Sequence, residues 1–350
     1  MFVYISKRLL YGFLVLLGVI IVVFFLFNVL PGDPVSMMSG QRTDVATRAA
    51  ITKELGLDKP LPEQLALYLK DLSPVAVYDD TPANQEKYAY HKLFTMAQSA
   101  WVIKWPYLRR SFQTNKKVSE VILENVSGTF WLAFTAMLFA TIVGILLGVI
   151  AALRQNSWVD HTIITMSVAG ISAPEFVLAA IIAMVFGYYL SDYTGLNLTG
   201  QLWEVDLYGK RLVLKNLILP AFTLGLRPLS IIVQLTRSSM LEVLSQDYIR
   251  TAKAKGLGNR SIILKHSLKN ALNPVITAVS GWLASLMAGA FFVEYIFGWK
   301  GLGSVTIAAV YQLDFPVVMG TTLFIGVVFI FISIFVDILY AAIDPRVVLK

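Results

Sequence analysis

Cysteine is absent from the 350-residue sequence, and histidine occurs only three times, at His91, His161 and His266. The lack of cysteine excludes disulfides, thiolate metal sites and cysteine nucleophiles. The three histidines are scattered along the chain, so we do not expect them to form a metal site.

Common motifs of nucleotide-binding and hydrolytic enzymes are missing as well. There is no GxxxxGK[ST] phosphate-binding loop, no HExxH zinc motif and no GxSxG nucleophile motif. The glycine-rich stretch Gly298–Ser304 lacks the Gly-Lys-Ser that such a loop needs. We therefore predict that this chain has no catalytic, metal-binding or cofactor-binding residues.

Apolar residues, by contrast, are abundant: 57% of the chain is hydrophobic, and the mean hydropathy is +0.68. They gather into runs of about 20, the length at which a helix crosses about 30 Å of hydrocarbon. The sequence therefore predicts an all-α membrane protein with six transmembrane helices. The six runs are Leu9–Leu30, Gly128–Leu153, Thr162–Leu190, Leu217–Thr236, Pro274–Phe297 and Val317–Val336.

The first run, Leu9–Leu30, could be a cleaved signal peptide or a retained helix. It exceeds the usual apolar core of about 7–15 residues, and no small-x-small cleavage site precedes Pro31. We expect a retained first helix.

The charges in the short loops predict the orientation, because cytoplasmic loops collect Lys and Arg. They place both termini and the Asp247–Asn270 loop in the cytoplasm, and this also accounts for the net charge of +7 without nucleic acid. We expect three parts: the N-terminus and first helix (1–30), an external region (31–127) and a five-helix core (128–350). Within the external region, Thr52–Leu72 is typical of two short helices interrupted by prolines.

Three charges lie inside the apolar runs: Glu175, Arg227 and Glu294. A charge within the bilayer usually pairs or faces water. Glu175 and Arg227 both lie about halfway along their runs. They could pair or line an aqueous pathway together, occupy separate cavities, or reach an interface if the run boundaries differ. Glu294 lies near the outer end of its run, and we expect it at the external mouth of the pathway.

Two local features of the apolar runs have more than one interpretation. Gly144 and Gly148 form a GxxxG pair, which serves close packing either within the chain or between subunits. Pro174 interrupts the third run and predicts a kink, with a structural or a gating role.

The Asp247–Asn270 stretch is basic, with six Lys or Arg between two apolar runs. We expect a helix that brings Ile249, Ala252 and Leu257 together, a turn at Gly256 and Gly258, and a second helix capped by Ser261. The second helix should present one apolar stripe, consisting of Ile262, Ile263, Leu268, Ala271 and Leu272. From composition alone, such a stretch could be a solvated loop that sets topology, a contact for anionic lipid, or a docking element.

The segment Leu235–Thr277 closely resembles the cytoplasmic EAA loop of ABC-importer permeases, in particular the B-type subunit of the oligopeptide/dipeptide permease family. Shorter stretches agree with this resemblance in order along nearly the whole chain. They are "LPGDP" (Leu30–Pro34), "LGLDKPLPEQ" (Leu55–Gln64), "LPAFTLGL" (Leu219–Leu226) and "VEYIFGWKGLG" (Val293–Gly303).

The resemblance implies a type I ABC-importer permease fold in a bacterial or archaeal plasma (inner) membrane. It implies three kinds of protein partner: a second homologous permease, two cytoplasmic ATPases that bind the ATP, and an external solute-binding protein. Membrane lipid would surround the helices. The EAA loop, at 237–273, would couple the ATPases to the membrane helices. The resemblance assigns this coupling to Asp247, Arg250, Thr251, Ala252, Lys253, Ala254, Lys255, Gly256 and Leu257.

The sequence departs from the family pattern at three places. Lys269 and Lys300 stand where many relatives have proline, and Ser73–Lys104 is similar to an insertion in the external region. The sequence does not identify the solute, whether peptide, nickel chelate or another. Two other classes are disfavoured: an intramembrane hydrolase using Glu175 lacks a nucleophile or metal, and ABC exporters lack the EAA pattern.

Overall fold

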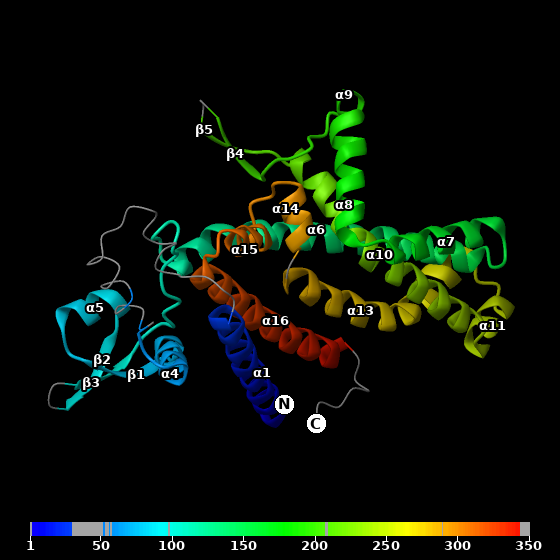
Figure 1. The fold of residues 1–350 in the computed structure, drawn as a ribbon. Helices are drawn as coiled ribbons and strands as arrows, with labels where there is room; N and C mark the ends of the chain where they lie inside the picture. The colour runs from blue at the N-terminus through cyan, green and yellow to red at the C-terminus, as the bar shows by residue number, and fades with distance from the viewer. Residues whose placement is uncertain are drawn as a thin grey trace. The chain divides into compact units, whose positions relative to one another are not determined.

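The computed structural model describes residues 2–29, 52, 56, 58–96, 99–206, 209–288 and 290–343. Helices make up most of these residues, as the apolar runs predict (Figure 1). The chain divides into two compact units. Unit 1 contains Met1–Gly12, Asn125–Val305 and Ile325–Lys350, and unit 2 contains Phe13–Glu124 and Thr306–Phe324.

Four helices in the described part of the chain are long and apolar enough to cross a membrane. They are α1 (Phe2–Val29), α6 (Val118–Leu153), α10 (Lys215–Leu244) and α16 (Phe315–Ile343). A fifth span results if α7 (Trp158–Ser172) and α8 (Glu175–Met184), with its π-helical continuation η1 (Val185–Tyr189), are taken together. The expected count of six spans is therefore confirmed only in part.

The third expected span, Thr162–Leu190, is not one straight helix. α7 ends at Ser172, Ala173 has an extended backbone (ψ 137°), and the two helical pieces meet at 107°. The residue before a proline avoids helical geometry, so Pro174 ends α7 rather than merely kinking it. The chain then continues through η1 to the short helix α9 (Ser191–Thr194) and the hairpin of β4 (Trp203–Asp206) and β5 (Gly209–Leu212).

The fifth expected span, Pro274–Phe297, is also divided. The long helix α13 (Lys269–Ala288) ends before a separate short helix, α14 (Phe291–Ile296). Ala290 precedes α14 with a non-helical backbone (φ −86°, ψ 42°), so the helical hydrogen bonding does not continue through it. After α14, the chain forms α15 (Leu302–Tyr311) before the last long helix.

In unit 1, α10 is packed against α7, α8 and α13, and α7, α10 and α13 lie side by side (Figure 1). Two glycines of α6 allow it to approach α10 closely. A Cβ at Gly144 would lie 2.8 Å from Ile232 Cγ2, and a Cβ at Gly148 would lie 2.5 Å from Thr236 Cβ. The GxxxG pair therefore serves packing within this chain.

Unit 2 contains a small antiparallel sheet that the all-helical prediction missed. Its strands are β1 (Val75–Asp79), β2 (His91–Met96) and β3 (Ser99–Ile103), in the order β1-β3-β2, with the short helix α5 (Pro82–Tyr88) between β1 and β2. The sheet occupies the segment that resembles an insertion, Ser73–Lys104. Its strands alternate buried and exposed residues over only about five positions, which is a weak local signal.

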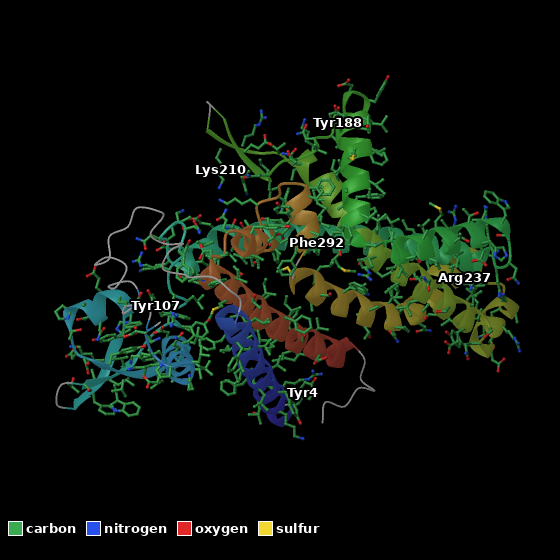
Figure 2. All side chains as sticks on the ribbon, in the orientation of Figure 1. Tyr4, Tyr107, Tyr188, Lys210, Arg237 and Phe292 are labelled. Atoms are coloured by element: carbon green, nitrogen blue, oxygen red, sulfur yellow. The ribbon has the colours of Figure 1, made fainter. Side chains whose placement is uncertain are left out.

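A group of tyrosines and cations holds this sheet against α4 (Leu61–Leu72). Asp71 is the centre of the group: its carboxylate accepts hydrogen bonds from Tyr88 (3.2 Å) and Arg109 (3.1 Å), and its backbone carbonyl accepts one from the Lys104 ammonium. Tyr78 stacks on Tyr88 with 4.3 Å between ring centroids. Burial lowers the pKa of Lys104. Tyr107, labelled in Figure 2, packs edge-on against Tyr88, and its backbone N–H donates to the Asp71 carbonyl (2.9 Å). Side-chain contacts and backbone hydrogen bonds together therefore hold this part of the chain against α4.

Two expectations about the external region have partial outcomes. α4 is a single helix that begins after Pro60, so the second of the two short helices predicted in Thr52–Leu72 is present. Most of the first one, and the "LPGDP" motif at 30–34, lie outside the described residues.

Candidate coupling loop and charged residues of the core

The basic stretch forms a helix, a turn and a second helical segment, as predicted. α10 ends at Leu244, and α11 (Asp247–Ala254) follows almost at once. After the turn come the single-turn helix α12 (Asn259–Ser261) and the π-helical segment η2 (Ile262–Leu268). η2 continues directly into α13, so the loop connects two long helices of unit 1.

Gly256 ends α11 in a left-handed conformation, with φ +75°. The Gly256 N–H donates to the Lys253 carbonyl (3.0 Å), and the Leu257 N–H donates to the Ala252 carbonyl (3.3 Å). This pair of bonds is a Schellman motif, which favours glycine because a side chain strains the left-handed backbone. A Cβ at Gly256 would meet nothing within 4 Å, so the backbone conformation, not crowding within the chain, accounts for the glycine.

The apolar side of α11 packs against η2 through a buried cluster of Ile249, Ala252 and Ile262. Leu257 was expected in this cluster, but its side chain is 40% exposed, and Ile262 takes its place because η2 folds back onto α11. Ser261 was expected to cap the second helix. It is already inside the helical turn, and Gly258 precedes the helix without a side-chain cap.

Of the residues assigned to the coupling loop, Ala252 is buried, and the others lie on the surface of the chain. They are Asp247, Arg250, Thr251, Lys253, Ala254, Lys255, Gly256 and Leu257. Arg250 and Asp247 form an exposed ion pair (3.2 Å), which at that exposure is weak. The structure therefore places the apolar anchor of α11 inward and a largely polar surface outward.

Glu175 and Arg227 lie near each other but do not form a contact ion pair. Glu175 is the first residue of α8, directly after the break, and Arg227 is on an exposed part of α10. Arg227 is close enough to act electrostatically on the Glu175 carboxyl. No charged atoms of these two described residues come within 4 Å of each other, so direct pairing is not seen in this conformation.

We expected the Glu294 side chain to reach the external mouth of the pathway. Instead it is fully buried within the chain, with 0% of its surface exposed. Its carboxylate accepts hydrogen bonds from the Thr129 hydroxyl (2.7 Å) and the Ser304 N–H (3.0 Å). Those donors make a buried position tolerable for a carboxylate. Glu294 thus joins α14 to α6 and to the start of α15.

The glycines around Glu294 have a steric explanation. A Cβ at Gly301 would collide with the Glu294 carboxylate, and one at Gly303 would lie 2.7 Å from the Phe291 Cα atom. A Cβ at Gly128, on α6, would collide with the Lys300 backbone carbonyl. The "GWKGLG" stretch is therefore a close-packed turn around a buried carboxylate, which explains its glycines without any bound ligand.

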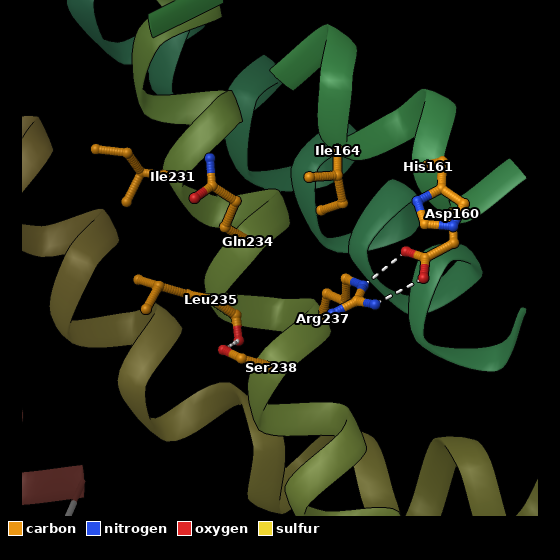
Figure 3. Close-up of a pocket in the computed structure, with 8 residues that line it drawn as sticks. All are labelled: Asp160, His161, Ile164, Ile231, Gln234, Leu235, Arg237 and Ser238. Carbon is orange, nitrogen blue, oxygen red and sulfur yellow. Dashed lines mark hydrogen bonds and ion pairs between the residues drawn. The ribbon is translucent and has the colours of Figure 1, made fainter. Parts of the chain in front are cut away.

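A second buried acid was not singled out from the sequence. Asp160, 1% exposed, accepts two hydrogen bonds from Arg237, from Nε to Oδ1 and from Nη2 to Oδ2, both 2.6 Å long (Figure 3). The pair borders a hollow between α7 and α10. The residues that line it are Asp160, His161, Ile164, Ile231, Gln234, Leu235, Arg237 and Ser238. The Ser157-x-x-Asp160 spacing of a helix N-terminus was the available signal for Asp160.

The described residues contain no group of three or more His, Asp or Glu side chains that could hold a metal ion. Among the described residues of unit 1, the buried carboxylates of Asp160 and Glu294 are both satisfied by hydrogen bonds from the protein. The arrangement combines a helix-turn-helix stretch that has a polar outer surface with polar positions among apolar helices.

Comparison with known proteins gives matches along the whole chain. Residues 144–349 match the family described as "Binding-protein-dependent transport system inner membrane component", and residues 1–133 match the N-terminal part of such components. A dipeptide transport system permease protein of Alkalihalophilus pseudofirmus is 35% identical, with 99% of both chains covered.

Other relatives agree. A dipeptide transport system permease protein of Bacillus subtilis is 36% identical, covering 93% of this chain and 91% of that one. A glutathione transport system permease protein of Salmonella typhi is 33% identical, covering 98% of each. Among solved structures, an inward-facing methionine ABC transporter shares the fold, with a TM-score of 0.52 at 19% identity over 65% of this chain and 97% of that chain.

These matches are to transport components and not to enzymes, and they cover both the apolar helices and the candidate coupling loop. The chain belongs to the family of inner membrane components of binding-protein-dependent transport systems, as an ABC permease of the oligopeptide and dipeptide type.

Proposed function

We propose that this chain is the B-type permease subunit of an ABC importer that carries peptides or related small solutes. The relatives named for dipeptide and glutathione transport support this solute class, because they match nearly the full chain. The observation that carries the proposal is the coupling loop. A short helix with an outward polar surface ends in a glycine-dependent turn and leads without a break into a long apolar helix.

One of the two cytoplasmic ATPases of the complex would dock on the outward surface of α11, around Arg250, Thr251 and Lys253. Its two nucleotide states would bind this surface differently, since only a difference in affinity can drive a conformational change. The buried Ile249 and Ile262 transmit movement of α11 to η2, and thus to α13. The chain would bind no ATP and no cofactor of its own.

The solute would pass between this chain and a second, homologous permease. Glu175 and Arg227 are proposed to line that pathway together. A polar face of α13, which packs against the Arg227-bearing helix α10, supports a water-filled pathway on this side of the chain. The residues of this face recur at every fourth position and are exposed; they are Asn273, Thr277, Gly281 and Ser285. A surface of this kind suits water or a polar partner better than lipid tails. Glu294 is left out of the pathway because its carboxylate is buried and satisfied.

The proposed topology places both termini in the cytoplasm and the region 31–127 outside, in the inner membrane. An external solute-binding protein would deliver the solute to that side. Lipid would surround α1, whose side chains from Leu9 to Val15 are mostly exposed.

Reconstitution tests the proposal. The chain, its partner permease, both ATPases and the binding protein are placed in proteoliposomes, and uptake of a labelled dipeptide, tripeptide and glutathione is measured. We expect uptake of at least one of them that requires both ATP and the binding protein. ATP-dependent movement of these solutes outward, or no uptake of any of them by an active ATPase complex, would overturn the proposal.

A further inference from the structure

The Asp160–Arg237 pair joins two helices that are distant in sequence, at the end of the core where the coupling loop begins (Figure 3). Asp160 lies in the first turn of α7, and Arg237 lies two turns before the end of α10 at Leu244. Two parallel hydrogen bonds fix the direction between the side chains as well as their distance. Rotation or sliding of one helix against the other would break at least one of these bonds.

On the α7 side, the carboxylate is also tied to the turn that connects α6 to α7. The Asn156 N–H donates to Asp160 Oδ2 (2.9 Å), and the Asp160 N–H donates to the Ser157 hydroxyl that caps the helix (3.3 Å). Asn156 itself has a left-handed backbone, with φ +61°. The carboxylate therefore connects Arg237 to a helix start and to its preceding turn.

On the α10 side, apolar packing takes over close to the ion pair. Met240, one turn after Arg237, is fully buried in a cluster with Ala152 of α6 and Ala271 of α13. The cytoplasmic ends of α6, α10 and α13 are thus held together by apolar contacts. The first turns of α7 are attached to this group through the ion pair and through Ile163 and Ile164, which pack against the apolar core.

The Asp160 carboxylate is buried, whereas 25% of the Arg237 side chain is exposed. Ion pairs of this kind often add little net stability compared with apolar pairs of similar size, but two parallel hydrogen bonds specify their geometry. We propose that Asp160 and Arg237 are positioning residues for energy coupling: they make α7 and the cytoplasmic end of α10 move as one rigid body when the ATPases move the coupling loop. This inference rests on the proposed function. Through α7, the movement then reaches the break at Pro174 and the proposed pathway residue Glu175.

The alternative to rigid-body movement is that α7 and α10 separate here. A gate at this position would have to separate Asp160 from Arg237 during each cycle. Because the chain has no native cysteine, one cysteine pair can distinguish the two behaviours. The Asp160→Cys/Arg237→Cys variant is compared before and after treatment with a bifunctional thiol reagent about as long as the original ion pair, since a direct disulfide needs a shorter span.

The experiment uses the complete reconstituted complex, and its readout is peptide transported per ATP hydrolysed. We expect the untreated cysteine pair, and Asp160→Asn and Arg237→Gln alone, to lower this ratio at least fivefold. Cross-linking should restore at least half of the wild-type ratio. Arg237→Lys, which keeps the charge but cannot form the two-bond geometry, should give an intermediate ratio.

Two outcomes would overturn the inference: a wild-type ratio in the untreated variants, or loss of transport on cross-linking, which would mean that the pair must open. The same protein is compared before and after cross-linking, so a low yield of the variant does not obscure the result. As a matched control, neutralising the exposed Lys116–Glu124 pair by Lys116→Gln/Glu124→Gln should leave the ratio unchanged.

Gly256→Pro is measured in parallel to separate this inference from the proposed function. If Gly256→Pro uncouples transport while the Asp160 and Arg237 variants do not, only the positioning role fails. If Gly256→Pro also couples normally, the assignment of the coupling loop itself is wrong.

Discussion

The Thr129 hydroxyl donates a 2.7 Å hydrogen bond to the Glu294 carboxylate, and neither side chain is accessible to solvent. The same Thr129 oxygen accepts the Leu302 N–H (2.8 Å), so one hydroxyl connects a helix start to a buried acid. The contact ties α6 to the turn between α14 and α15, and its loss should be measurable as a loss of stability.

The first prediction concerns this contact. Glu294→Ala should lower the free energy of unfolding by about 3 kcal/mol, because it leaves the Thr129 and Ser304 donors unsatisfied at about 1–3 kcal/mol each. Thr129→Val should cost about 1–3 kcal/mol, and the double variant less than the sum. Thermal unfolding of the purified protein in detergent measures these effects. Glu242→Ala, at an exposed position, is the control, and equal losses at both glutamates would refute the structural role.

The second prediction separates backbone conformation from space in the coupling loop. Gly256 and Gly258 both have open space where a Cβ would lie, but only Gly256 has a positive φ; Gly258 has φ −65°. A left-handed alanine is strained by about 1–2 kcal/mol. Gly256→Ala should therefore lower transport per ATP by about 5–30-fold, and Gly258→Ala should leave it near the wild-type ratio. If the alanine at 258 is the more damaging one, partner contact rather than backbone conformation determines these glycines.

The third prediction concerns Glu175 and Arg227. Glu175→Gln and Arg227→Gln should each impair uptake or stability, because each leaves the other charge without its oppositely charged neighbour along the proposed pathway. Changing both should cost clearly less than the sum of the single losses. The measurement is uptake rate together with thermal unfolding for the three variants. Strictly additive losses would show that the charges act separately.

The fourth prediction concerns topology. The cysteine-free chain allows single cysteines at Glu86 on α5 and at Asn259 in the coupling loop, both of which are exposed. A membrane-impermeant thiol reagent should label position 86 only from outside and position 259 only from inside. Labelling of both from one side would contradict the proposed orientation.

Local sequence signals predicted the helix and turn of the Asp247–Asn270 stretch, because each signal was complete within a few residues. The spacing of Ile249 and Ala252 indicated the buried side of α11, and Gly256 indicated its end. The position of Ile262 in the same cluster depends on the folding back of η2, which no local pattern encodes.

The contacts that the sequence did not predict are those between residues far apart in the chain. Asp160 and Arg237 are separated by 77 positions, and Thr129 and Glu294 by 165. Helix depth alone suggested that Glu294 would reach solvent, whereas nearby hydroxyl and backbone donors make a buried position possible. Pro174 predicted a kink, but the 107° angle depends on what α8 packs against, which includes α10 and α14.

The π-helical segment η2 has a consequence for how the loop tolerates changes in length. Its hydrogen bonds run from i to i+5, so it holds an additional residue compared with an α-helical turn. Deletion of one residue between Ile262 and Leu268 can be absorbed by a return to α-helical pairing, and α13 then keeps its rotational register. The α-helical part of α13 contains no additional residue of this kind. A deletion there would rotate the residues that follow it by about 100° about the helix axis. Length differences among related chains, and tolerated single-residue deletions, should therefore concentrate in η2.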